Sequence, residues 1–141
     1  MKKTTRMLAL ALTMLPLFAV AQLSRDTRIV TNVPFDFVVA NKAVPAGEWI
    51  LQAASDGGRT LLLNNVDART ALFSTASTDT SKQPARAYSL VFHKYGDRYF
   101  LAAVKLGGSK TMYQIPKSKA EAEMMAQNMA PTETILLASV K

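Results

Sequence analysis

His93 is the only histidine among the 141 residues of the chain, which contains no cysteine. A metal ligand needs companion ligands, and a general base needs an orienting or reacting partner. The sequence places neither beside His93. We interpret it as a structural residue that faces Phe100 across two strands.

Asp36 and Glu48 are the most notable carboxylates, because each lies in a strongly apolar strand neighbourhood. If the first hairpin brings them together, they could serve as an acid and a base. A salt bridge from either residue to Lys42 or to an arginine is the simpler explanation. We therefore predict no catalytic residue, no cofactor and no metal ligand, and a protein that is not an enzyme.

A second group of residues combines cations with aromatic rings around the pair Gly96-Asp97. Such a group can stack on a sugar ring or a base, or it can pair across strands and cover the end of a sheet. The candidate ligand or partner contacts are Lys94, Tyr95, Arg98 and Tyr99.

These residues lie in the segment 90–104, where two apolar runs flank Gly96-Asp97 and predict a β-hairpin with a two-residue turn. The predicted register pairs Tyr95 with Arg98, Lys94 with Tyr99, His93 with Phe100, Phe92 with Leu101, and Val91 with Ala102. Both faces are apolar away from the turn. The hairpin is therefore either covered on both faces or offers one apolar face to a ligand or partner.

Further short strands are predicted at 29–39, 48–53, 59–66, 70–75, 111–115 and 132–140, with turns at 41–42, 45–47, 55–58 and 67–68. The Ser/Thr/Asp-rich segment 74–82 has no apolar period and is predicted to be an exposed mobile loop.

One helix is predicted at 119–128, with Ser118 as its N-cap and Glu121 completing a capping box. Its stripe of Ala122, Met125, Ala126 and Met129 is expected to lie against the sheet. Seven or eight strands in a meander predict a mainly β fold, a small antiparallel barrel or sandwich, with this helix packed on it before a last strand. The strands are too short and irregular for a membrane-spanning barrel.

The N-terminus has the pattern of a secretory signal peptide: Lys2, Lys3 and Arg6 precede an apolar run at 7–20, and Ala19 and Ala21 form the cleavage signal. An uncleaved anchor is the alternative. We predict a signal peptide at 1–21, a flexible lead at 22–27 and a single β-rich domain at 28–141. The protein would then be exported, periplasmic or secreted, without a membrane span after signal removal and without a nucleic-acid partner.

Four motifs occur in order along the chain: residues 33–37 (VPFDF), 45–49 (PAGEW), 90–101 (LVFHKYGDRYFL) and 116–121 (PKSKAE). On these motifs the chain resembles a family of small exported bacterial proteins of unknown function. The resemblance implies an exported β-rich domain and transfers no catalytic residue. The chain departs from the family pattern after Leu101, where Ala102 and Ala103 stand in place of a large aromatic.

Two functions remain open. In the first, the domain binds a small apolar or amphipathic molecule, or a sugar, in a barrel mouth or on the aromatic hairpin. In the second, it is an interaction or structural module that docks a hairpin or edge strand on another envelope protein. A pocket lined by Phe35, Phe37, Trp49, Phe92 and Leu101 would favour the first function, and the same residues closed into a core would favour the second.

Overall fold

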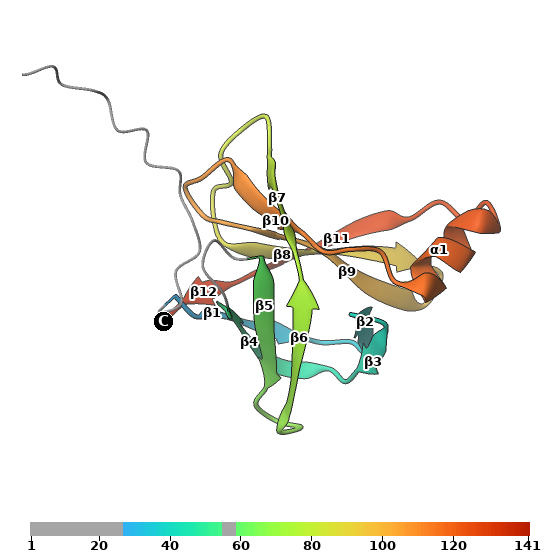
Figure 1. Ribbon diagram of the computed structural model, residues 1–141, viewed down its shortest axis with the longest axis horizontal. Coiled ribbons are helices and arrows are strands. Elements are labelled where there is room, and N and C mark those ends of the chain that lie inside the picture. The colour runs from blue at the N-terminus through green and yellow to red at the C-terminus, as the bar shows by residue number, and fades with distance from the viewer. Residues whose placement is uncertain (1–26, 55–58) are drawn as a thin grey trace, which may run out of the picture.

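The computed structural model describes residues 27–54 and 59–141, which form twelve strands and one helix (Figure 1). The predicted signal peptide, its cleavage residues Ala19 and Ala21, nearly all of the predicted lead and the turn at 55–58 lie outside the described residues. The mainly β class and the late helix are confirmed. The strands are more numerous than the seven or eight expected, because the predicted strands at 29–39 and 132–140 are each divided in two, and β3 and β7 form where a turn and a loop were predicted.

The first sheet is antiparallel and has the order β12-β1-β4-β5-β6. Its strands are β12 (Ser139–Val140), β1 (Ile29–Val33), β4 (Gly47–Ala53), β5 (Thr60–Asn65) and β6 (Thr70–Thr75). Alternating burial along β4 and β5 places one face of this sheet in the core, as the period of two in a strand requires.

The second sheet has the order β11-β8-β9-β10-β7. These strands are β11 (Thr132–Leu137), β8 (Ser89–Tyr95), β9 (Arg98–Lys105), β10 (Thr111–Gln114) and β7 (Ser77–Thr80). A small hairpin of β2 (Phe37–Val39) and β3 (Lys42–Val44) joins this sheet at the edge of β9.

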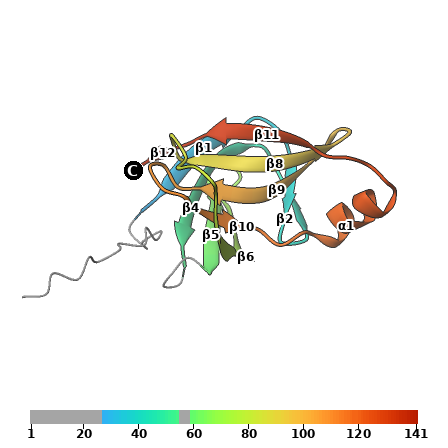
Figure 2. The same ribbon diagram turned by 90° about the horizontal axis from the view of Figure 1, so that it is seen from above.

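The two sheets pack face to face without closing into a barrel, so the sandwich is the alternative that describes the fold. In Figure 1, β4 to β6 run steeply across β8 to β11, as in orthogonally packed sheets. Figure 2 shows the same arrangement from above, with α1 (Lys119–Ala126) at one end of the second sheet.

The core is closed by aromatic side chains from both sheets and the small hairpin. Phe37 contacts Trp49 edge to face, with ring centroids 5.3 Å apart, and contacts Phe92 in the same way at 5.2 Å. Trp49, Phe92, Leu101 and Phe37 are all buried. These residues therefore fill the space between the sheets, which is the arrangement expected to favour an interaction module over a ligand held in a pocket of these residues.

The predicted hairpin forms with the predicted register from the turn to the Phe92–Leu101 pair. Beyond that pair a β-bulge follows, so Val91 pairs with Ala103 and not with Ala102. The extra residue lets Val104 face the core together with Leu90.

The prediction of a mobile loop at 74–82 is wrong, because this segment contains a paired strand. β7 lies within it and pairs residue by residue with β10, from Ser77 opposite Gln114 to Thr80 opposite Thr111. All four residues of β7 are exposed. An edge strand of this kind needs no apolar alternation, because backbone hydrogen bonds hold it in place.

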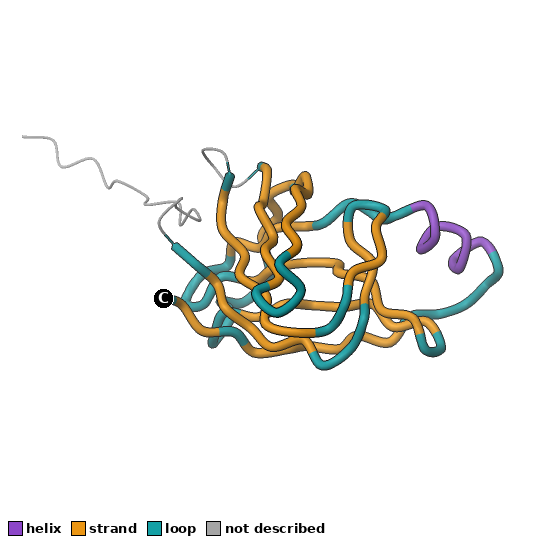
Figure 3. Tube along the Cα trace, turned by 90° about the horizontal axis from the view of Figure 1, so that it is seen from below, coloured by secondary structure: helices purple, strands orange, loops and turns teal. Residues whose placement is uncertain are grey.

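The helix ends two residues earlier than predicted, and its expected packing is wrong. Ala122, Met125, Ala126 and Met129 are exposed, and the buried residue of α1 is Glu121. Figure 3 shows the helix at the end of the molecule, with loops on both sides. The buried Glu121, and not the apolar stripe, therefore sets which side of this short helix faces the sheet.

Candidate functional site

The four predicted contact residues divide between two faces of the hairpin, as their register requires. Lys94 lies over the Tyr99 ring at 5.4 Å, and the other partner of that ring is Phe35, stacked at 3.7 Å between centroids. On the opposite face, the exposed Arg98 lies over the Phe100 ring at 5.3 Å. Tyr95 is only 2% exposed.

Tyr95 takes part in a buried polar cluster with His93 and Glu121. The Tyr95 hydroxyl donates to Glu121 Oε1 at 3.1 Å, and His93 Nδ1 lies 2.7 Å from the same oxygen. Glu121 is 2% exposed, whereas the His93 side chain is 25% exposed. The carboxylate is thus a shared partner for two groups on one strand face. We name these three residues the Glu121 cluster.

The N-terminus of α1 positions Glu121. Ser118 caps the helix, as predicted, and its Oγ accepts the Glu121 N–H at 3.1 Å. The Lys119 N–H donates to Asn41 Oδ1 at 2.9 Å, which ties the helix to the β2–β3 turn. In that turn Ala40 and Asn41 have φ angles of 51° and 61°. This left-handed pair matches the hairpin turn in which asparagine is favoured and alanine is strained.

The cluster fixes one nitrogen of His93 on a carboxylate, which sets the orientation of the ring. It also gives each buried polar atom a partner, because an unpaired hydroxyl or carboxylate at this depth would be costly. The described residues contain no group of three or more His, Asp or Glu side chains arranged to hold a metal ion. The geometry therefore supports anchoring of α1 on the hairpin.

An open groove lies beside this cluster, and it consists of two hollows that share three lining residues. The larger hollow, of about 390 Å³, lies between the β2–β3 hairpin and α1, and the smaller, of about 190 Å³, lies at the hairpin tip. Val38, Ala43 and Arg98 line both hollows. We call this feature the tip groove.

The lining of the tip groove combines small apolar residues with polar and charged ones. The larger hollow adds Asn41, Ser118, Lys119, Ala120 and Glu123, and the smaller adds Asp36, Phe37, Asp97 and Tyr99. Guanidinium, carboxylate and amide groups of this kind can form several hydrogen bonds to one polar ligand. Of the four predicted contacts, Arg98 and Tyr99 line the groove.

Asp36 and Glu48 have separate roles in the structure. The Asp36 carboxylate accepts the Ala46 N–H at 2.9 Å, which is turn chemistry. Glu48 lies on β4 opposite Asn32, and its backbone N–H donates to Asp67 at 2.9 Å. The structure therefore gives the Asp36 carboxylate a local role in a turn, whereas the hydrogen bond of Glu48 involves its backbone and assigns no role to its carboxylate.

Glu121 is the residue that sequence reasoning missed as a partner of His93, because the capping box already explained it. The sequence nevertheless contained a signal that His93 and Tyr95 need a polar partner. His93 and Tyr95 share one predicted strand face with Phe100, and two hydrogen-bonding groups on an apolar face require a partner when that face is covered.

Comparison of the chain with protein-family models, with curated proteins and with solved structures finds no match. No helix in the described part of the chain is long and apolar enough to cross a membrane.

Tyr95 is expected to ionise at higher pH than an ordinary tyrosine. Burial raises its pKa from 10.0 to about 12, and the charge of Glu121 and the hydrogen bond to it act in the same direction. Because the pKa is raised in the folded state, the stabilisation that Tyr95 contributes is complete below about pH 10 and is lost as the pH rises through about 12. Tyrosinate absorbance during a pH titration measures this, with Tyr95→Phe identifying the transition.

In Glu121→Gln the same transition should move to lower pH, because the negative charge is gone while the size of the side chain is kept. A Tyr95 transition near pH 10 in the unaltered protein, the value for an unperturbed tyrosine, would contradict the geometry of the cluster.

Proposed function

We propose that this protein is a non-enzymatic, exported binding domain that holds a glycan in the tip groove. The observation that carries the proposal is the groove itself: an open hollow of about 390 Å³ that shares Val38, Ala43 and Arg98 with a second hollow at the hairpin tip. Ligand sites are typically concave and combine apolar walls with a few polar groups that fix orientation. The closed core favours this outer position over an apolar ligand held between the sheets.

A sugar suits the groove because its hydroxyl groups can both donate and accept hydrogen bonds. Arg98 supplies fixed donors, Asp97 and Glu123 supply acceptors, and Asn41 supplies both. The small side chains of Val38 and Ala43 leave room for the apolar face of a sugar ring. An apolar ligand would leave these charged groups without hydrogen-bond partners.

The first test is native mass spectrometry of the protein purified gently from an envelope fraction, compared with the same protein after refolding. A stoichiometric carbohydrate adduct that disappears on refolding supports the proposal. A clean mass in both preparations, together with no binding on an array of neutral and acidic oligosaccharides, would contradict it.

Replacing Arg98 with alanine is expected to weaken binding of the best oligosaccharide about 10-fold, because a charged donor at the junction of the two hollows is lost. Isothermal titration calorimetry measures the affinity. Arg86→Ala is the matched control, because Arg86 is exposed in the segment before β8, at the other end of that strand from the tip. Equal affinities of Arg98→Ala and Arg86→Ala would show that Arg98 does not contribute to ligand binding.

A second candidate function is docking on another envelope protein, and the edge strand β11 favours it. Ile135 and Leu137 on this strand are 51% and 74% exposed. An exposed edge strand with apolar side chains can pair with a strand of a partner. In the same native mass spectra, a protein complex without a carbohydrate adduct would favour this second function.

A further inference from the structure

The aromatic rings predicted at the hairpin tip have little surface left for stacking on a sugar. Tyr95 is buried within the Glu121 cluster. Tyr99 has Phe35 stacked on its ring and Lys94 as a cation partner. If the proposed glycan makes a stacking contact, that contact must come from another aromatic residue near the groove.

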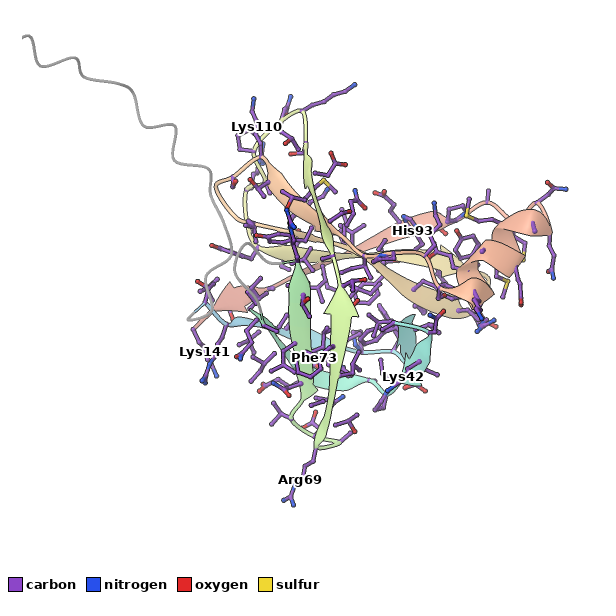
Figure 4. All side chains as sticks on the ribbon, viewed as in Figure 1. Lys42, Arg69, Phe73, His93, Lys110 and Lys141 are labelled. Atoms are coloured by element: carbon purple, nitrogen blue, oxygen red, sulfur yellow. The ribbon has the colours of Figure 1, made fainter. Side chains whose placement is uncertain are left out.

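Phe73 meets this requirement. It is 64% exposed, and within residues 27–54 and 59–141 it is the only aromatic residue in the exposed class. It lies on β6, in the other sheet, and Figure 4 labels it there. Phe73 and Asn41 of the β2–β3 turn are far apart in sequence but line the same hollow.

Phe73 lines a third hollow, of about 220 Å³, that adjoins the tip groove. Asn41 and Ser118 line this hollow and also the larger hollow of the tip groove. The hydrogen bond from the Lys119 N–H to Asn41 lies where the two hollows meet. Because Asn41 and Ser118 form the wall that the two hollows share, a ligand that occupies both must pass over these residues to reach Phe73.

The charges in these two adjoining hollows are mainly positive. Arg98 and Lys119 line the larger hollow and Lys117 lines the third, whereas Glu123 is the only carboxylate residue that lines either of them. The smaller hollow of the tip groove contains Asp36 and Asp97, so the excess of cations is confined to the larger and third hollows. Cations close together on a partly enclosed surface attract an anionic ligand. The third hollow also contains hydroxyl side chains beside the Phe73 ring.

We infer that the ligand is a linear acidic glycan, and that one of its sugar rings stacks on Phe73 while neighbouring rings occupy the larger hollow of the tip groove. This inference rests on the proposed function and extends it, because it names the chemical class of the ligand and requires an oligosaccharide of several sugar units. An aromatic ring offers an apolar face to the C–H groups of a sugar, and the adjacent cations pair with its carboxylates.

The test measures binding of acidic oligogalacturonates of increasing length, and of neutral maltooligosaccharides of matching length, by isothermal titration calorimetry. Affinity for the acidic series should rise with length until the third hollow is filled. Phe73→Ala should weaken binding of the long acidic ligands by roughly 10-fold and leave the shortest binding ligand unchanged. Phe73→Trp should restore the affinity.

Leu137→Ala is the matched control, because Leu137 is 74% exposed on β11 and lines none of the three hollows. Binding that Phe73→Ala leaves unchanged would overturn the inference while the proposed function stands. Equal affinities for the acidic and neutral series would overturn the acidic class. No binding of either series to the unaltered protein would overturn the inference, and a clean native mass beside it would overturn the proposed function as well.

Discussion

Replacing Glu121 with alanine is expected to destabilise the fold by about 2–4 kcal/mol. The substitution leaves His93 Nδ1 and the Tyr95 hydroxyl without the oxygen that lies 2.7 Å and 3.1 Å from them. Tyr95 is buried, so water cannot easily replace the lost partner. Urea unfolding followed by circular dichroism measures the loss.

Glu123→Ala is the control for this prediction. Glu123 lies on the same helix two residues away, and its side chain is exposed. Its substitution should change the free energy of unfolding by no more than about 0.5 kcal/mol. Similar losses in the two variants would show that the Glu121 cluster does not anchor the helix.

The loss in Glu121→Ala should be concentrated in α1. Glu121 is the one buried residue of this helix, and the helix is too short to be stable alone. Hydrogen exchange should therefore accelerate at α1 amides before it accelerates in β8 and β9. Since residues 118–120 and Glu123 line the tip groove, the same variant should also bind the glycan more weakly.

The central hairpin was predictable because a two-residue turn fixes which residues face each other. From Gly96-Asp97, the pairs follow by counting as far as Phe92 and Leu101. The bulge beyond them was not predictable. Leu101 is followed by Ala102 and Ala103, and two small apolar residues in a row give no alternation that marks which one is the extra residue.

The errors on β7 and α1 have a common cause. Both predictions treated apolar periodicity as the sign of packing. β7 has four exposed residues and is held by its backbone pairing with β10. In α1 the apolar stripe exists, but the inward side is set by one carboxylate and its two partners on β8.

The candidate site was only partly predictable for a similar reason. Arg98 and Tyr99 were found because they surround a recognisable turn. Asn41 belongs to another turn and lines the larger hollow together with Arg98, and Phe73 on β6 lines the adjoining hollow together with Asn41 and residues 116–118. Residues that come together across two sheets have no characteristic spacing in the sequence, so their contact cannot be predicted from it.

At Gly47, both the backbone conformation and the neighbouring side chains require glycine. Gly47 lies in the turn predicted at 45–47 and has a φ of 138°, a conformation that glycine adopts without strain. A Cβ atom at this position would lie 2.7 Å from Asp67 Oδ2 and 3.2 Å from the Asn65 side-chain amide. Asp67 Oδ2 accepts the Glu48 N–H, and Asn65 Oδ1 accepts the Ala68 N–H.

Gly47→Ala is therefore expected to destabilise the fold by about 2–4 kcal/mol, as backbone strain and a steric clash act together. Urea unfolding gives the value.

Gly96→Ala is the matched control, because the φ of Gly96 is 58° and nothing lies within 4 Å of an added Cβ. This variant should therefore lose only about 1 kcal/mol of the free energy of unfolding. Adding Asp67→Ala to Gly47→Ala separates the two causes: the clash with the carboxylate is relieved and the strain remains. If Gly47→Ala is no more destabilising than Gly96→Ala, Asp67 and Asn65 are free to move, and they do not hold the start of β4 against the β5–β6 turn.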